Sequence, residues 1–157
     1  MAYTICENSG IKSRDTWMDS IKPRKLQTDD LEDADWVESQ RLLVDADNDN
    51  TGLKWILARD PKTVLNSVRD ALNNGDYGFI LDYSTAPFVD PKVIEKYKSI
   101  MVTGRNLAWM PRLKQYLDDG HAVILVGAGH LPGENGLISL LQSNGYTVKA
   151  ITLPESQ

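Results

Sequence analysis

The sequence predicts an α/β fold, in which a helical N-terminal section covers a small, mostly parallel sheet near the C-terminus. The first observation behind this prediction is the apolar run 122–126, AVILV, which is rich in β-branched residues and typical of a strand buried on both faces. The second is the order of the next segments: a glycine-rich turn, a short leucine-patterned stretch and the run 146–153, YTVKAITL. Strand, turn, helix and strand within about thirty residues make one βαβ unit.

Composition limits the classes of protein to consider. The 157 residues suffice for one domain, and 17 basic against 22 acidic residues give a net charge of −5. This balance argues against a nucleic-acid partner, which requires a basic face. The single cysteine, Cys6, excludes an internal disulfide and a CxxC site. No apolar run approaches the roughly 20 residues of a membrane span, and the start lacks a signal-peptide core, so we expect a cytoplasmic protein.

Three helices are expected before residue 100, after a start (1–27) without clear periodicity. Residues 29–44 have apolar side chains at helical spacing, with Thr28 as the capping residue and acids near the positive end. The Asp-Pro pairs at 60–61 and 90–91 each predict a helix start, because aspartate caps the first turn and proline fits it. The stretch YGFILDY is compatible with either a strand or a helix.

A further helical stretch is expected after Gly104, but with an interruption. A proline inside a helix removes one hydrogen bond and collides with the preceding turn. Pro111 therefore predicts a break or bend near residue 110, followed by a second helical piece that Gly120 closes.

The turn GAGH, residues 127–130, is the candidate site. His130 lies just beyond the carboxyl end of the predicted strand 122–126, which is where ligands bind in open α/β sheets. Gly127 and Gly129 allow the backbone to turn sharply and to approach a ligand closely. A neutral imidazole is a common metal ligand and a general base. The alternative is a histidine that caps the next helix or bonds a loop carbonyl.

Two other interpretations are weaker. Gly127, Gly129 and Gly133 resemble the start of a dinucleotide-binding fingerprint, but Pro132 interrupts the turn and few strands can follow so near the C-terminus. The acidic stretch 45–50 suggests calcium, but its frame lacks the glycine and the glutamate that an EF-hand requires. A polar loop is the better interpretation of that stretch.

A resemblance to a known family adds to these observations. The segments GRNLAWMPRLKQYL and GHAVILVGAGHLPGENGLISLLQSNGYTVKAI resemble the C-terminal part of the TraB/GumN (PrgY, Tiki-like) family. That ending has an RN..W helix, a strand, a GxxH turn, a helix and a GY.V strand. The resemblance is dense over 104–150 and looser back to about residue 65. We therefore expect one domain over 1–157, with a divergent, loosely ordered part at 1–60 and a TraB/GumN-like part at 61–157. The matching residues are Arg105, Asn106, Trp109, Gly127, His130, Gly133, Leu137, Gly145, Tyr146 and Val148.

The resemblance implies a hydrolase-like site. Members of the family are similar to metal-dependent hydrolases, some of them protease-like, with two GxxH motifs, an early glutamate and the arginine of the RN pair in the proposed site. Carried onto this sequence, Arg105 and His130 would be catalytic, and His130 would bind a divalent metal such as zinc, manganese or cobalt. The expected ligand contacts are Gly127, Gly129, Asn106 and Trp109, and Trp109 would either stack on Arg105 or lie in the core.

The sequence departs from the family pattern in ways that limit the expected activity. It supplies only the second GxxH motif, and LLVDAD at 42–47 only faintly resembles the strand that carries the family's glutamate. His121 falls at the opposite end of the predicted strand from His130, so we expect it at the surface. The chain is thus interpreted as a truncated or degenerate member that binds a small-molecule or peptide-like ligand, with catalysis incomplete in the single chain. A homodimer that joins two His130 side chains remains open, and the alternative is a non-catalytic interaction or regulatory module.

Overall fold

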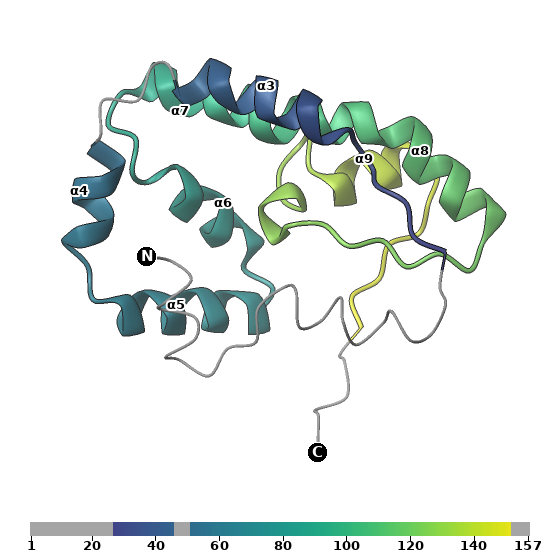
Figure 1. The fold of residues 1–157 in the computed structure, drawn as a ribbon. Helices are drawn as coiled ribbons and strands as arrows, with labels where there is room; N and C mark the ends of the chain where they lie inside the picture. The colour runs from purple at the N-terminus through teal and green to yellow at the C-terminus, as the bar shows by residue number, and fades with distance from the viewer. Residues whose placement is uncertain (1–26, 46–50, 152–157) are drawn as a thin grey trace.

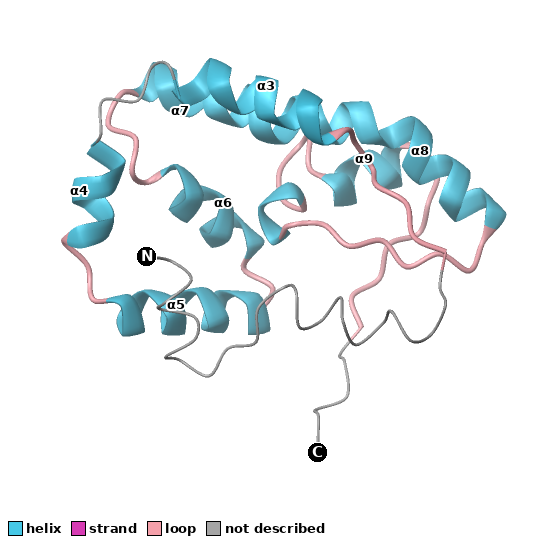
Figure 2. Cartoon of the chain, viewed as in Figure 1, coloured by secondary structure: helices cyan, strands magenta, loops and turns pink. Residues whose placement is uncertain are grey.

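The computed structural model describes residues 27–45 and 51–151, and these ranges form helices joined by loops (Figures 1 and 2). No residue in these ranges belongs to a β-strand. The predicted α/β fold, with its parallel sheet and C-terminal βαβ unit, is therefore wrong for the described part, which is mainly helical. The predictions for 1–26, for the acidic loop 46–50 and for the end of the second strand lie outside the described residues.

The longest part of the fold is an uninterrupted helical rod from Pro91 to Asp119, in which a π-helical stretch joins two α-helices. Helix α3 lies along the first half of this rod, while α5 and α6 pack on one another below it (Figure 1). In chain order the elements are α3 (Ala34–Asp45), α4 (Thr51–Leu57), α5 (Pro61–Asn73), α6 (Tyr77–Thr85), α7 (Pro91–Tyr97), the π-helix η2 (Lys98–Gly104), α8 (Arg105–Asp119), the 3₁₀-helix η3 (Ala128–His130) and α9 (Leu137–Ser143).

Helix α3 begins five residues later than the sequence predicts. The Asp33 carboxylate accepts the backbone N–H groups of Asp35 (2.9 Å) and Trp36 (3.0 Å), so Asp33, rather than Thr28, caps the helix. Several acids in a row offer competing caps, and local sequence does not rank them. As a consequence, residues 27–33 are non-helical and are available for contacts elsewhere.

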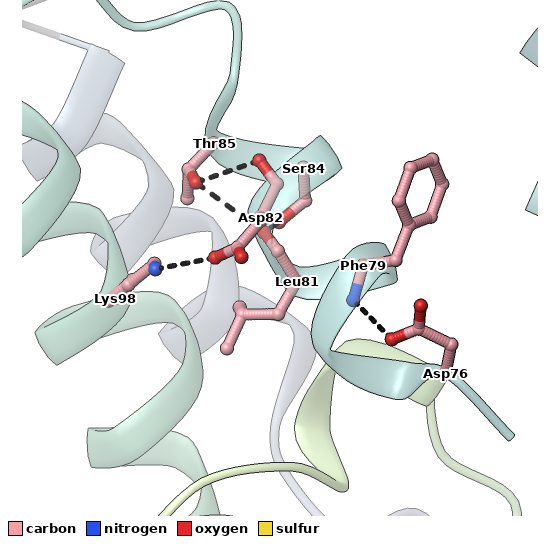
Figure 3. A network of polar contacts seen from close by, with 7 residues as sticks. All are labelled: Asp76, Phe79, Leu81, Asp82, Ser84, Thr85 and Lys98. Carbon is pink, nitrogen blue, oxygen red and sulfur yellow. Dashed lines mark hydrogen bonds and ion pairs between the residues drawn. The ribbon is translucent and has the colours of Figure 1, made fainter. Parts of the chain in front are cut away.

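The two Asp-Pro helix starts are confirmed. Asp60 accepts the backbone N–H of Thr63 at 2.8 Å, and Asp90 accepts that of Lys92 at 2.9 Å. The ambiguous stretch YGFILDY is helical, as part of α6, and Asp76 caps it by accepting the Phe79 N–H at 3.0 Å (Figure 3).

The predicted break near residue 110 does not occur, because α8 continues through Pro111 to Asp119. The alternative, a bend within a continuous helix, stays a prediction. Proline removes a single backbone donor, and the burial of Trp109, Met110 and Leu113 on both sides of it holds the helix together. The expected stop at Gly120 is confirmed, with φ at 76°. The irregular part of the rod is instead the π-helix.

Gly104 ends that π-helical stretch. A Cβ at this position would lie 3.0 Å from the backbone oxygen of Ser99, which is tighter than an ordinary contact. The missing side chain thus lets the wide π turn close before α8 begins.

The run 122–126 forms a loop rather than a strand, although its side chains alternate as in a strand. Ile124 and Val126 pack against the core, whereas Val123 is 85% exposed and Leu125 is 61% exposed. A strand requires a second segment to pair with, and none of the described residues supplies one. The second predicted strand fails for the same reason, since its described part is loop and Ile151 is exposed.

The main core joins α8, α9 and the segments that flank them. Four side chains are buried at its centre, and partly buried apolar residues from α9, the loop, the turn and the N-terminal segment surround them. Burial of such side chains is the main source of stability in a domain. The central residues are Trp109, Met110, Leu113 and Leu137, and the surrounding ones are Leu31, Ile124, Val126, Leu131, Leu140 and Leu141.

Helix α6 supports the GAGH turn from the other side. It contacts η3 directly, and a Cβ at Gly129 would lie 3.8 Å from the Cα of Leu81. Asp82 of α6 also pairs with Lys98 of η2, with 3.1 Å between the charged atoms, and Figure 3 shows the two side chains facing one another. The Lys98–Asp82 pair is largely exposed, so its contribution to stability is small.

None of the helices in the described ranges combines the length and the apolar character required to cross a lipid bilayer.

A substitution at Gly136 tests how tightly the turn before α9 is packed. Gly136 is buried, and a Cβ there would overlap the backbone oxygens of Leu131 and Pro132. We expect Gly136→Ala to lower the free energy of unfolding by about 1–3 kcal/mol, as overpacking does. Gly78→Ala is the control, because a Cβ there meets only Asp76 Oδ1 at 3.6 Å, and its stability should be unchanged or slightly higher. Urea unfolding followed by tryptophan fluorescence measures both, and equal effects would contradict the prediction.

Candidate functional site

The site is organised by the buried side-chain amide of Asn106, the second residue of α8. This side chain is fully buried, and its Nδ2 group donates hydrogen bonds to the backbone oxygens of His130 (3.1 Å) and Asn135 (2.8 Å). Its Oδ1 atom lies 2.7 Å from Nδ1 of the His130 ring. The turn itself is closed by a hydrogen bond from the His130 N–H to the Gly127 oxygen at 2.9 Å. One amide therefore fixes both the backbone and the ring of His130.

These contacts determine which ring nitrogen of His130 carries the proton. Both N–H groups of the Asn106 amide donate to backbone oxygens, so its Oδ1 faces the ring as an acceptor. Reversing the amide would place its oxygen against two carbonyl oxygens. The His130 Nδ1 must therefore be the protonated nitrogen, and in the neutral ring the lone pair lies on Nε2. Within the described residues no hydrogen bond engages Nε2.

The surroundings keep the His130 ring neutral. Burial lowers the pKa of His130 to about 4, and the positive charge of Arg105 acts in the same direction, while the Glu32 carboxylate opposes them. Near neutral pH the imidazole is thus uncharged, with Nε2 available as an acceptor. Its low pKa also makes it a poor carrier of protons near neutrality, since a general base works best when its pKa is close to the ambient pH.

Glu32 is the site residue that the sequence did not reveal. Its carboxylate accepts hydrogen bonds from Arg105 Nε (3.0 Å) and Trp109 Nε1 (2.9 Å), and Arg105 Nη2 donates to its other oxygen. The Arg105 and Glu32 side chains are only 18% and 17% exposed. Burial by itself raises the pKa of Glu32, but these hydrogen bonds outweigh it and the pKa is lowered, so the residue is ionised.

Trp109 connects the two halves of the site. Its ring lies 4.6 Å from that of His130, and the Arg105 guanidinium lies 5.1 Å from the indole. The indole is also 4% exposed and central to the core. Trp109 therefore has both of the roles considered for it: it stacks on Arg105 and it packs in the core.

The structure brings together the residues that the sequence singled out. Arg105, Asn106 and Trp109 follow one another on α8, and the turn with His130 lies against them. Gly127 lies beside the ring, since a Cβ there would be 3.6 Å from His130 Cδ2. Gly129 faces α6, so the close approach that it permits is made to a neighbouring helix.

Two other candidates lie apart from the site. His121 is exposed, as expected, with φ at 60° just after Gly120. In LLVDAD, residues 42–45 belong to α3 rather than to a strand, and the last two residues lie outside the described ranges. The glutamate beside the arginine is Glu32, which stands 73 positions before it in the sequence. No local spacing could have connected the two.

The described residues do not fit a resident catalytic metal ion. In the ranges 27–45 and 51–151, no group of three or more histidine, cysteine, aspartate or glutamate side chains could hold one. His130 offers one free nitrogen, and both oxygens of Glu32 already accept hydrogen bonds. Catalytic sites generally use about three protein ligands.

The fold and the site define a helical protein in which an Arg-Asn pair on a long helix orients the histidine of a glycine-flanked turn. The family model described as the TraB/PrgY/gumN family matches residues 28–150, most of the chain. The chain therefore belongs to this family, which confirms the resemblance. The matched region includes Glu32. No curated protein and no solved structure matches the chain.

Replacement of Asn106 tests the amide that organises the site. We expect Asn106→Ala to lower the free energy of unfolding by about 2 kcal/mol or more, because two backbone oxygens and the His130 ring lose their partner. In the same variant, ¹⁵N NMR should show the proton of His130 distributed over both ring nitrogens. Asn73→Ala, at an exposed helix end, is the control and should change neither property. A stable Asn106→Ala variant with an unchanged tautomer would contradict this interpretation.

The lowered pKa of His130 predicts a specific pH dependence of stability. Between pH 6.5 and 4, His130 is protonated in the unfolded state but not in the folded state. The free energy of unfolding therefore falls as the pH drops through this interval, and it is fully regained above pH 6.5. From pH 6.5 to 5 most carboxylates remain ionised, so His130 should dominate the slope there. Urea unfolding should show a smaller slope in His130→Ala than in wild type. The control His121→Asn suits the left-handed backbone at that position and removes the chain's other histidine. A slope reduced equally in both variants would contradict the assignment to His130.

Proposed function

We propose that this member of the TraB/PrgY/gumN family binds a peptide-like ligand at His130, without completing hydrolysis in the single chain. The observation that supports this proposal is the fixed tautomer of His130, whose neutral ring keeps Nε2 as an acceptor without a partner among the described residues. A fully satisfied buried amide that holds a ring in one orientation also fixes which ring nitrogen can meet a ligand.

The chemistry of the ring suits binding better than proton transfer. An amide N–H of a ligand can donate to Nε2, and the neutral ring retains this acceptor over the whole range above its pKa. Hydrolysis of a peptide bond would further require an activated water or a strong nucleophile. The described residues supply a weak base and an arginine already paired with Glu32. Binding without turnover is therefore the function that this geometry supports best.

A divalent metal enters the proposal only with help from outside the described residues. Neutral imidazole is a suitable ligand for zinc, manganese or cobalt, and Asn106 orients it as hydrogen-bonded neighbours orient the histidine ligands of metal sites. Two or more further ligands would have to come from a second copy of the chain or from residues that the structure does not describe. Tight zinc binding that depends on His130 would be the sign of such an arrangement.

A non-catalytic interaction or regulatory module is the second candidate, and one observation favours it. Apart from His130 Nε2, which is not fully buried, the polar groups of the site satisfy one another, and no buried side-chain nitrogen or oxygen in the described residues lacks a partner. Clusters of this kind also occur where a family keeps its fold for packing alone. In that case, replacing His130 would alter stability and nothing else.

A nuclear magnetic resonance titration decides between these functions. The ¹⁵N resonances of the free protein should show Nδ1 protonated and Nε2 bare at neutral pH. A mixture of short peptides blocked at both ends should shift the His130 resonances in a saturable way and leave those of exposed His121 unchanged. A parallel titration with zinc tests the metal. If neither peptides nor zinc move the His130 resonances, the proposal fails and the non-catalytic module is favoured.

The His130→Ala variant provides the second arm of this test. The indole N–H resonance of Trp109, whose ring lies against His130, should respond to the peptides in wild type and not in this variant. An equal response in both proteins would show that the peptides bind elsewhere.

A further inference from the structure

Three N–H groups of α8 converge on one carboxylate. Arg105 donates hydrogen bonds from Nε and Nη2 to the two carboxylate oxygens of Glu32, and Trp109 Nε1 donates to one of the same oxygens at 2.9 Å. Paired donors from a planar guanidinium match a carboxylate in both shape and charge. The arrangement is that of a carboxylate-binding site whose occupant comes from the same chain.

The donors are held more firmly than their occupant. Trp109 is buried in the core, and the guanidinium also contacts the Met101 backbone oxygen at 3.4 Å. Both donor residues lie on α8, whereas Glu32 lies in the non-helical segment 27–33. If the occupant leaves, the donors therefore keep their positions for another carboxylate, which is the condition for a preorganised subsite.

Among the described residues, the remaining contacts of the segment around Glu32 are modest. Leu31 packs at the margin of the core, and Asp29 pairs with Arg112 at 2.8 Å and accepts a hydrogen bond from Tyr116. The side chains of the Asp29–Arg112 pair are 48% and 42% exposed, so solvent weakens their attraction. Apart from the contacts of Glu32 itself, this segment is therefore held by fewer buried side chains than α8.

The location of the subsite indicates what would replace Glu32. The Trp109 ring lies against the His130 ring, so a ligand whose carboxylate sits on Arg105 and Trp109 has its next groups beside the imidazole. We infer that Arg105 and Trp109 form a subsite for a ligand carboxylate, and that Glu32 fills this subsite until a ligand displaces it. The inference rests on the proposed ligand site at His130 and names its ligand class: peptides or similar molecules with a free carboxylate.

Glu32→Gln is the direct test, because it keeps the shape of the side chain and removes the competing charge. The probe is N-acetylglycine, which carries a carboxylate next to an amide. We expect Glu32→Gln to bind it about tenfold more tightly than wild type, since the carboxylate forms a charge-assisted bidentate pair that the neutral amide cannot match. The indole resonance of Trp109 and the side-chain resonance of Arg105 report the binding.

Glu38→Gln is the matched control. Glu38 makes a bidentate pair with Arg41 at 3.0 Å and 2.8 Å, but this pair is exposed on helix α3. Glu38→Gln changes the net charge of the protein by the same amount as Glu32→Gln. This variant should bind the probe as wild type does, and adding Arg105→Gln to Glu32→Gln should abolish the gain. Equal affinities in Glu32→Gln and Glu38→Gln would overturn the inference.

Two further measurements keep the result interpretable. If Glu32→Gln does not fold, titration of wild type to high concentrations of N-acetylglycine decides, and a Trp109 indole resonance without a saturable shift overturns the inference. In the double variant Glu32→Gln/His130→Ala the gain in carboxylate affinity should persist, and its loss would count against a subsite made by Arg105 and Trp109. The two proposals can therefore fail separately. Blocked peptides test ligand binding at His130, and N-acetylglycine tests carboxylate binding at Arg105.

Discussion

The structure depends on one buried amide more than on any other polar group. Asn106 is fully enclosed at the start of α8, and its hydrogen bonds reach the backbone on both sides of the tight turn as well as the His130 ring. In a low-dielectric surrounding such a group must be fully satisfied, which leaves a single arrangement of the turn. The tautomer of His130 is a consequence of this constraint.

The long rod from Pro91 to Asp119 gives that amide a fixed base. Its middle is a π-helix, a form that is rare and often found at functional positions. The wider π turns end at Gly104, and the next residues, Arg105 and Asn106, begin the α-helix. Arginine and asparagine are neighbours in the sequence and so point in different directions: one meets the N-terminal segment, and the other meets the turn. A short sequence pair thus links two segments that lie far apart along the chain.

Much of the site could be predicted from the sequence, and rather little of the overall fold could. The Arg-Asn pair, Trp109 and the GAGH turn stand in one order with characteristic gaps, and the structure places them together. Helix starts at Asp60 and Asp90 were predictable because a cap acts within one turn. The strands were not, since AVILV has the composition of a buried strand but pairing requires a distant segment. The break predicted at Pro111 does not occur, because burial on both sides outweighs a local penalty.

The sequence alone determined the local chemistry: the two helix starts at Asp60 and Asp90, which turn needs glycine, and that one histidine comes directly after it. These features depend on contacts within a few residues, where the identity of the side chain decides the conformation. Only the tertiary structure decided that Glu32 neutralises Arg105, that His130 is held neutral by burial, and that 122–126 has one face exposed. The reason is physical: burial and ion pairing arise between segments tens of residues apart, and their energies depend on distances that the order of residues does not specify.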